Sequence, residues 1–393
     1  MRRVLLLNNV PAPYFDPLFE RIGRESGWRL TVCYSSDWNK DVGWRNKAQV
    51  KEAAHHTIVL DQQNQWLKSK LGSSLAAAIA LAKILISERP EYLICYGYTL
   101  APQITAIIWA MATGTSFAII GDTNYINDIA KGLKRLVKRF WLRMVTKRAA
   151  ALIAIGRANR LFWESYSARP EQLFEARFAV DNDYFAHAIA EREEDARRWR
   201  ARGGLSDKVV FLYVGRLIKR KNVDLIIGAA KRTNDERIAV VIAGDGEERE
   251  SLETLANGAS RVTFIGAVAP DDLPLYYAAA DALILPAGQE PWGLVINEAM
   301  ACGLAIIAHA DCGAAVDLVG PDVGVKLETF TAQELAEAMR LLGADDENRL
   351  AMRRRAKSKI QKWSIAAAAQ GIIHAVESSS QADTDHAHTN SAN

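Results

Sequence analysis

The feature that most constrains the fold is a rhythm in which short apolar segments alternate with longer helical ones. In the first half, the segments expected to form strands are Val4–Leu7, Leu30–Tyr34, His56–Leu60, Tyr92–Tyr96, Phe117–Ile120 and Ala151–Ile155. The rhythm restarts in the second half with Val209–Val214, Ile238–Ala243, Val262–Ile265, Ala282–Pro286 and Ala305–Ala308. Strands that alternate with helices are typical of a parallel, doubly wound α/β sheet, so two such sheets are expected.

Breaks in this rhythm predict the domain boundaries of the 393-residue chain. Residues 1–180 are expected to form the first domain, 181–204 a charged interdomain linker, and 205–362 the second domain. Residues 363–378 follow as a last helix. Residues 379–393 are polar and have no apolar anchor, so they are expected to be disordered.

Composition excludes several classes of protein. A net charge of +3 argues against an overall polyanion binder. The four cysteines form no Cys-x-x-Cys pair and lie in or beside apolar stretches, which indicates reduced core residues of a cytoplasmic protein.

The uncharged region 92–121 is interrupted by Gly97, Pro102 and Gly114, so a buried β-α-β unit explains it better than a membrane-spanning helix. The triplet Asp-Asn-Asp at 181–183 resembles a metal-binding Asp-x-Asp pair, but its place at the domain junction favours a capping role.

The segment P-A-G-Q-E-P-W-G-L-V-I-N-E-A-M-A-C-G at 286–303 is the strongest candidate for a binding site. Glu290 lies in the loop after an expected strand and Glu298 on the next helix, where carboxylates can accept hydrogen bonds from sugar hydroxyls and from a ribose diol. Between them, Gly293-Leu294-Val295 opens the helix, and its free N–H groups suit a phosphate. The alternative is a loop charge and a solvated helix charge, but the flanking glycines and strands make the pattern specific.

Two further turns follow expected strands. In V-G-R-L-I-K-R-K-N at 214–222, Arg216 and Lys221 could bind a diphosphate and stabilise the charge that builds up as a nucleoside diphosphate leaves. A basic solvated turn is the alternative, because Lys219 and Arg220 are basic too. The turn A-G-D-G at 243–246 contributes Gly244, which is weak evidence by itself.

The second half resembles the donor-binding domain of glycosyltransferase family 4, which has the GT-B fold. The resemblance covers about residues 210–320. It rests on V-G-R-L-x-x-x-K, V-I-A-G-D-G, F-I-G-A-V and E-P-W-G-L-V-I-N-E-A-M-A-C-G-L-A-I-I. The first half is similar only in its overall pattern. The resemblance implies two doubly wound Rossmann-like domains that face each other across a cleft, with the helix at 363–378 crossing back to the first domain.

The resemblance also implies a retaining sugar transfer with no metal ion and no other cofactor, and a nucleotide-sugar as the donor. It implies that Glu290 holds the donor sugar, that Glu298 holds the ribose, and that Arg216 and Lys221 hold the diphosphate. The other residues expected at the donor site are Gly215, Gly244, Gly266, Val268, Gly293, Leu294 and Val295.

The first domain departs from the family's pattern at two places. Many members have a Gly-Gly turn in the first loop, which here reads N-N-V-P-A-P-Y-F at 8–15. Many also have a histidine in the first-domain cleft, and Y-G-Y-T at 96–99 contains none. Asp122 is the substitute candidate for a catalytic group on the acceptor side, and a capping Asp that starts a turn is the alternative.

Residues 129–148 form a basic amphipathic stretch that has no acidic residue. Leu133, Val137, Phe140, Trp141 and Met144 fall on one helical face, which is expected either to pack on the sheet or to lie at a membrane. The residues expected to contact an anionic membrane are Lys134, Arg135, Lys138, Arg139 and Trp141. Nucleic acid is a poorer partner, because no recognition motif accompanies the charges.

Together these patterns predict a cytoplasmic hexosyltransferase that is peripheral on the inner face of the plasma membrane. Its expected acceptor is a glycan or a lipid-linked sugar of cell-surface glycan biosynthesis. Two alternatives stay open: a nucleotide-sugar epimerase on the same fold, and a non-catalytic partner subunit that binds nucleotide-sugar or lipid. The sequence names neither the sugar nor the base.

Overall fold

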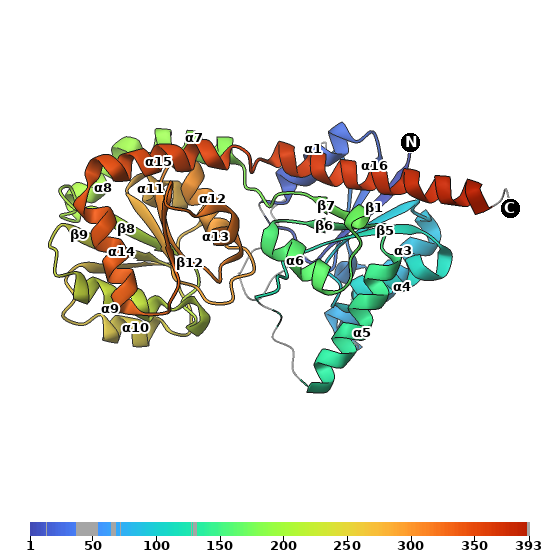
Figure 1. Cartoon of the computed structure of the whole chain (residues 1–393), viewed down its shortest axis with the longest axis horizontal. Coiled ribbons are helices and arrows are strands. Elements are labelled where there is room, and N and C mark those ends of the chain that lie inside the picture. Colours follow the sequence, from blue (N-terminus) through green and yellow to red (C-terminus); the bar gives the residue numbers. More distant parts are fainter. Residues whose placement is uncertain are drawn as a thin grey trace. The chain divides into compact units, whose positions relative to one another are not determined.

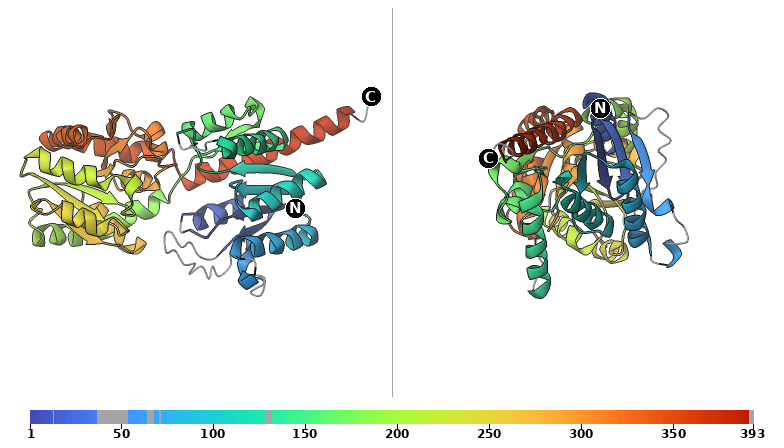
Figure 2. Two further views of the ribbon diagram at one scale, coloured as in Figure 1. Left: turned by 90° about the horizontal axis from the view of Figure 1, so that it is seen from below. Right: turned by 90° about the vertical axis from the view of Figure 1, so that its right-hand side faces the viewer.

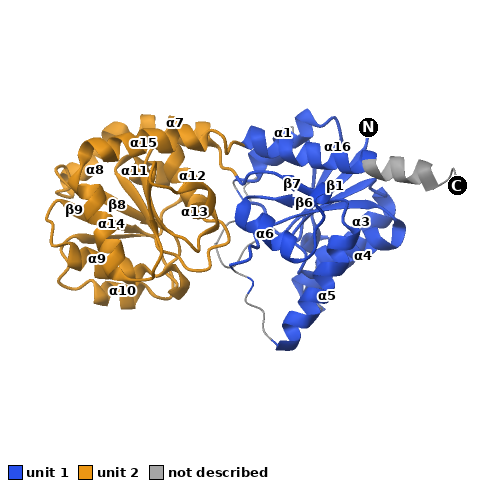
Figure 3. Cartoon of the chain, in the orientation of Figure 1, with its two compact units in different colours: residues 1–178, 365–393 blue, residues 179–364 orange. Residues whose placement is uncertain are grey.

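The computed structural model describes residues 1–12, 14–36, 54–63, 68–70, 72–126, 128 and 132–390, with side chains as far as Gln381. The chain divides into two compact units (Figure 3). Unit 1 comprises Met1–Phe178 and Ile365–Asn393, and unit 2 comprises Ala179–Ser364. Among the helices described here, none is long and apolar enough to cross a membrane.

Unit 1 is built on a parallel sheet with the strand order β3-β2-β1-β4-β5-β6-β7. The strands are β1 (Arg3–Asn8), β2 (Arg29–Tyr34), β3 (His56–Val59), β4 (Tyr92–Tyr96), β5 (Ser116–Ile120), β6 (Ala151–Ala154) and β7 (Leu173–Glu175). The central strands are apolar on both faces because helices cover both sides of the sheet. The predicted α/β class with doubly wound sheets is therefore confirmed.

The helices of unit 1 cover the two faces of this sheet (Figure 1). They are α1 (Asp16–Glu25), α3 (Ser73–Glu88), α4 (Ala101–Thr113), α5 (Gly132–Arg148), α6 (Arg157–Ser165) and α16 (Ile365–Asn390), with short 3₁₀ turns at Leu60–Gln62 and Pro170–Gln172. Helix α16 packs on α1 and on β5, β6 and β7, whereas α3, α4, α5 and α6 contribute to the core of the other face.

The tail begins later than predicted, because α16 continues past residue 378. Ser379 is buried, and its hydroxyl lies 2.7 Å from the Tyr92 hydroxyl. Ser380 accepts a hydrogen bond of 3.0 Å from Arg2. These contacts anchor the polar start of the tail to the sheet. The prediction for residues 391–393 falls outside the described residues.

Unit 2 contains a second parallel sheet with the order β10-β9-β8-β11-β12-β13. Its strands are β8 (Val209–Val214), β9 (Ile238–Ala243), β10 (Val262–Gly266), β11 (Ala282–Leu285), β12 (Ala305–His309) and β13 (Gly324–Leu327). Its helices are α7 (Asn182–Glu191), α8 (Glu193–Arg202), α9 (Val223–Thr233), α10 (Arg249–Leu255), α11 (Leu273–Ala278), α12 (Leu294–Ala301), α13 (Gly313–Leu318), α14 (Ala332–Ala344) and α15 (Asp346–Ile360). Short 3₁₀ turns lie at Lys219–Lys221 and Pro270–Asp272.

Residues 181–204, expected as a linker between the domains, form α7 and α8 and group with unit 2. Both helices pack on α11 of unit 2, and α7 also packs on α12. Asp181 caps α7 by accepting a hydrogen bond of 3.0 Å from the Tyr184 N–H, which confirms the capping role predicted for the Asp-Asn-Asp triplet. The Asn182 side chain donates to the carbonyls of Ile360 and Trp363 at 3.1 and 3.0 Å, so the segment is fixed to the end of α15.

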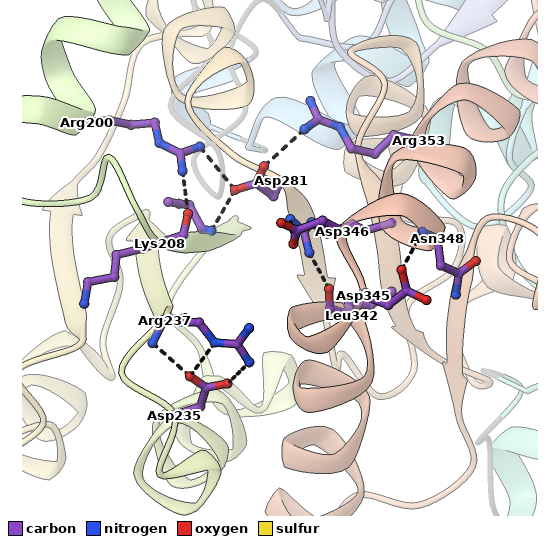
Figure 4. A network of polar contacts seen from close by, with 12 residues as sticks. Arg200, Lys208, Asp235, Arg237, Asp281, Leu342, Asp345, Asp346, Asn348 and Arg353 are labelled. Carbon is purple, nitrogen blue, oxygen red and sulfur yellow. Dashed lines mark hydrogen bonds and ion pairs between the residues drawn. The ribbon is translucent and has the colours of Figure 1, made fainter.

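A buried carboxylate ties α8 and α15 to the second sheet (Figure 4). Asp281 precedes β11 and is 8% exposed. It accepts hydrogen bonds from Arg200 and Arg353, both at 3.1 Å, and from the Val210 N–H at 2.9 Å. One side chain therefore joins two helices and two strands.

Candidate functional site

The candidate site of unit 2 lies where the strand order reverses. Strand β8 is followed in sequence by β9 but is also paired with β11, so the loops after β8 and β11 leave the same edge of the sheet side by side. In open α/β sheets, ligands bind at such a switch point. The Gly288 N–H donates to the Arg220 carbonyl at 3.0 Å, and the Asn222 side chain donates to the Pro286 carbonyl at 3.0 Å. The two predicted motifs, at 214–222 and 286–303, are therefore joined by hydrogen bonds.

The centre of this site is the Glu290 carboxylate. Lys221 Nζ donates a hydrogen bond to Glu290 Oε2, and an Arg220 guanidinium nitrogen donates to the same oxygen at 3.2 Å. The Lys221 and Glu290 side chains are 13% and 12% exposed, whereas Arg220 is 45% exposed. The structure thus brings together Glu290 and Lys221, two of the predicted site residues. It adds Arg220, which the sequence did not single out among three consecutive basic residues.

The main chain around Glu290 is held from a third loop. The Gly313 N–H donates to the Glu290 carbonyl at 3.0 Å, next to an isolated bridge between Glu290 and Cys312. Gly293 has a φ of +93°, and a Cβ there would lie 2.8 Å from Cys312 Sγ. Only glycine fits this position without a clash, and the donor contact predicted for Gly293 stays a prediction.

Helix α12 begins directly after Gly293, as the sequence predicts. The N-cap residue is glycine, which has no side chain to accept hydrogen bonds from the first N–H groups of the helix. The N–H groups of Leu294 and Val295 can therefore donate to a bound anion. Glu290 lies in the loop that leads into α12, and its two basic partners lie in the loop after β8. The N-terminus of α12 and these cations therefore occur in one neighbourhood.

Glu298 has a different partner from Glu290. It accepts a hydrogen bond of 2.6 Å from the hydroxyl of Tyr277 on α11. Burial raises the pKa of Glu298, and the Tyr277 hydrogen bond opposes that rise by favouring the carboxylate. The two glutamates therefore have different bonding partners. The ribose role of Glu298 stays a prediction.

The predicted glycines of the site lie at successive strand ends. Gly215 follows β8 and Gly244 follows β9, and a Cβ on Gly244 would lie 1.9 Å from the Gly215 carbonyl oxygen. The Gly244 N–H donates to the Gly266 carbonyl at 2.7 Å, which connects the turn to the end of β10. Val268 lies two residues beyond, partly buried. Close backbone packing therefore explains why Gly244 has no side chain. The nucleotide contacts predicted for these residues stay predictions.

Arg216 and Asp122 are both exposed. Arg216 follows β8, and its carbonyl accepts a hydrogen bond of 2.9 Å from the Tyr213 hydroxyl. Asp122 lies in the loop after β5 of unit 1, two residues beyond the end of the strand. Its charge is one of the smaller causes, after burial, that hold the pKa of Tyr98 at about 12. The catalytic roles of both residues stay predictions.

A buried glutamine organises the switch point of unit 1. Its place in an apolar stretch is the one feature of the sequence that could have indicated it. Gln103 is 1% exposed. Its oxygen accepts hydrogen bonds from the N–H groups of Thr99 and Leu100 at 2.9 and 3.0 Å, and its nitrogen donates to Asn9 at 2.6 Å. It therefore joins the loop after β1 to the loop after β4.

The basic helix α5 differs from the prediction in which side chains it exposes. Lys138 pairs with Asp128 at 2.9 Å, and Trp141 donates to the Tyr98 carbonyl at 3.0 Å. Both side chains are partly buried and bonded within unit 1, and the membrane contacts predicted for Lys138 and Trp141 stay predictions. Lys134, Arg135 and Arg139 are exposed.

Most of the apolar stripe of α5 faces solvent and does not pack on the sheet. Leu133, Val137 and Phe140 are 75%, 62% and 73% exposed, and Leu136 is 65% exposed. The N-terminal end of the helix extends beyond α3 and α4 (Figures 1 and 2), so only its second half packs on unit 1. We call the exposed residues of its N-terminal half the α5 surface: Leu133, Lys134, Arg135, Leu136, Val137, Arg139 and Phe140.

Residues 195–359 match the family model of glycosyl transferases group 1. The chain is 34% identical to D-inositol 3-phosphate glycosyltransferase of Corynebacterium aurimucosum over 217 residues, which are 52% of this chain and 51% of that protein. It is 31% identical to alpha-D-kanosaminyltransferase of Streptomyces kanamyceticus over 57% of this chain and 59% of that one. The matches thus span about half the length of these relatives.

Solved structures show the same fold over nearly the whole chain. Anabaena Alr3699/HepE in complex with UDP has a TM-score of 0.75 at 18% identity, covering 96% of this chain and all of that one. Sucrose-phosphate synthase from Thermosynechococcus elongatus has a TM-score of 0.72 at 18% identity and covers both chains completely. The chain therefore has the GT-B fold of two Rossmann-like domains, and its residues 195–359 are similar to the glycosyl transferases group 1.

Proposed function

We propose that the chain is a retaining, metal-independent hexosyltransferase that moves a hexose from a nucleotide-diphosphate sugar to a glycan or lipid-linked acceptor. The observation that carries this proposal is the Lys221–Glu290 pair at the switch point of unit 2, beside the N-terminus of α12. A cation, a carboxylate and free helix N–H groups in one place match a sugar diphosphate, which has both anionic oxygens and hydroxyls.

In this proposal the donor's sugar C1–O bond to the diphosphate breaks, and a bond forms between C1 and an acceptor oxygen on the same face. The acceptor hydroxyl loses its proton to the departing phosphate oxygen. Arg216, Lys221 and the first N–H groups of α12 stabilise the charge on the leaving diphosphate, while Glu290 accepts hydrogen bonds from the sugar and Glu298 from the ribose. Catalysis then consists of positioning and electrostatic stabilisation.

The names of similar proteins support a nucleotide-sugar donor. The Anabaena protein is known in complexes with UDP and with UDP-glucose. A mannosyltransferase of Mycobacterium tuberculosis, 32% identical over 185 residues, is GDP-mannose-dependent. These relatives use different bases and sugars, so the proposal leaves both open for this chain.

The donor proposal is tested by thermal shift of the purified chain with UDP, GDP, ADP and their hexose conjugates, each with and without EDTA. We expect one nucleotide family to raise the Tm equally in both conditions. A rise that EDTA abolishes would contradict metal independence. A chain that binds no nucleotide would favour the non-catalytic partner subunit, and donor consumed without acceptor would favour the epimerase.

We also propose that the α5 surface binds the anionic inner face of the plasma membrane and so brings the site to a lipid-linked acceptor. Leu133, Leu136, Val137 and Phe140 are more than half exposed, and the cations beside them face solvent. Helix α5 has no acidic residue to oppose an anionic lipid. Apolar insertion and electrostatic attraction together give reversible binding at an interface.

Co-sedimentation tests this contact with vesicles rich in phosphatidylserine and with vesicles of phosphatidylcholine alone. Leu133→Ser with Phe140→Ser should lower binding to the anionic vesicles, and so should Lys134→Gln with Arg139→Gln. Leu341→Ser, a change at a 55% exposed leucine of unit 2, is the matched control and should bind as the wild type does. Equal binding by all variants would refute the proposal.

A further inference from the structure

We propose that Arg220 is a positioning residue that holds one oxygen of Glu290 while the donor is bound, so that the other oxygen serves the sugar. The inference rests on the proposed function, because it assigns a role within the same donor site. Arg220 occupies a position that the family pattern V-G-R-L-x-x-x-K leaves open, so the resemblance gives it no role.

The first observation is that two cations share one oxygen. Lys221 and Arg220 both donate to Glu290 Oε2. In the proposed reaction Lys221 binds the diphosphate, so an incoming donor competes with Glu290 for that ammonium group. When Lys221 turns to the phosphate, Glu290 would lose its least exposed partner. Arg220 can then keep the carboxylate in place, since its own bond to Oε2 does not depend on Lys221.

The second observation is that the main chain fixes both ends of this contact. The Arg220 carbonyl accepts the Gly288 N–H at 3.0 Å, only two residues before Glu290. Gln289 lies between them with a φ of +53°, a left-handed conformation that is uncommon for a residue other than glycine. The bend at Gln289 turns the chain so that Glu290 points back to the turn that carries Arg220. A planar guanidinium on a fixed backbone suits this positioning role better than a flexible ammonium.

Two other roles for Arg220 make different predictions. As a direct ligand of the diphosphate, it would affect the binding of a bare nucleoside diphosphate and of the nucleotide-sugar equally. As a solvated surface residue, 45% exposed, it would affect neither, because exposed ion pairs contribute little. A positioning role affects the sugar conjugate alone.

The test compares UDP with UDP-glucose, or the GDP and mannose equivalents if those bind the wild type, by isothermal titration calorimetry. Arg220→Ala should weaken the nucleotide-sugar about tenfold, the effect of losing one charge-assisted hydrogen bond, and should change the nucleoside diphosphate less than about twofold. Arg220→Lys should restore part of the loss. Lys221→Ala should weaken both ligands. Lys219→Ala removes the same charge from the same turn and should leave both affinities within about twofold of the wild type.

Parallel losses of both ligands in Arg220→Ala would overturn the positioning role, and so would unchanged binding of both. A loss in Lys219→Ala equal to that in Arg220→Ala would assign the effect to net charge, and would also overturn it. If the wild type binds no nucleotide-sugar, the proposed function fails and this inference fails with it. Failure in the Arg220 variants alone leaves the proposed function standing.

Discussion

Asp281→Asn should cost more stability than any exposed ion-pair change in unit 2. The carboxylate accepts two hydrogen bonds from arginines and one from the Val210 N–H. An amide can replace only one of its oxygens as an acceptor, so at least one arginine loses its bond and the others lose their charge assistance. Three bonds weakened by about 1 kcal/mol each give about 3 kcal/mol, at the lower end for breaking a buried pair because Arg200 and Arg353 are 19% and 26% exposed.

The assay is urea unfolding followed by circular dichroism, with Asp235→Asn as the matched control. Asp235 pairs with Arg237, whose side chain is 58% exposed, elsewhere in unit 2 (Figure 4). This control should cost less than about 1 kcal/mol. For a unit of this size, 3 kcal/mol corresponds to a fall in Tm of about 6–12 °C. Equal costs for the two variants, or a cost below about 1 kcal/mol for Asp281→Asn, would refute the reasoning.

Two further predictions concern the walls of the site. Gly244→Ala places a Cβ 1.9 Å from the Gly215 carbonyl oxygen, so it should destabilise the chain by about 2–3 kcal/mol and weaken nucleotide binding. Gly258→Ala, at a φ of +78° in open space, should cost about 1 kcal/mol; equal costs in urea unfolding would contradict the clash. Because burial raises the pKa of Glu298, ionising it costs stability as pH rises from about 4 toward neutral. Glu298→Gln should therefore be favoured over the wild type more at pH 7 than at pH 4, and a difference that does not change with pH would contradict the raised pKa.

The sequence predicted the central strands because each is an apolar run buried on both faces. It missed β7 and β13, which end the two sheets in their strand orders and are only partly buried. An edge strand of three or four residues has no continuous apolar run to identify it. The charged segment 181–204 has the composition of a linker for a related reason, since α8 buries only Ala196 and its apolar signal is correspondingly weak.

The sequence could predict which loops carry the site residues, because the α/β topology alone sets the positions of those loops. Loops that follow neighbouring parallel strands meet at one edge, and the resemblance assigned Glu290 and Lys221 to one donor site. Contacts that depend on side-chain direction were not predictable. Three consecutive basic residues gave no sign that Arg220 reaches Glu290, and the Tyr277 partner of Glu298 comes from a helix 21 residues away. The stripe on α5 has helical spacing whether it faces a sheet or solvent, so its exposure required the structure.

The account's central claim is that the Lys221–Glu290 site transfers hexose with retention. The most direct test is a transfer assay with the nucleotide-sugar that binds, a membrane fraction as acceptor source, and anomeric analysis of the product by NMR. We expect product of retained configuration in the presence of EDTA. Lys221→Ala and Glu290→Ala should each lower kcat by about 10²–10³-fold, as for loss of one group that stabilises a transition-state charge, and both variants should fold normally by circular dichroism. Near-native turnover in both folded variants, or a product of inverted configuration, would contradict the account.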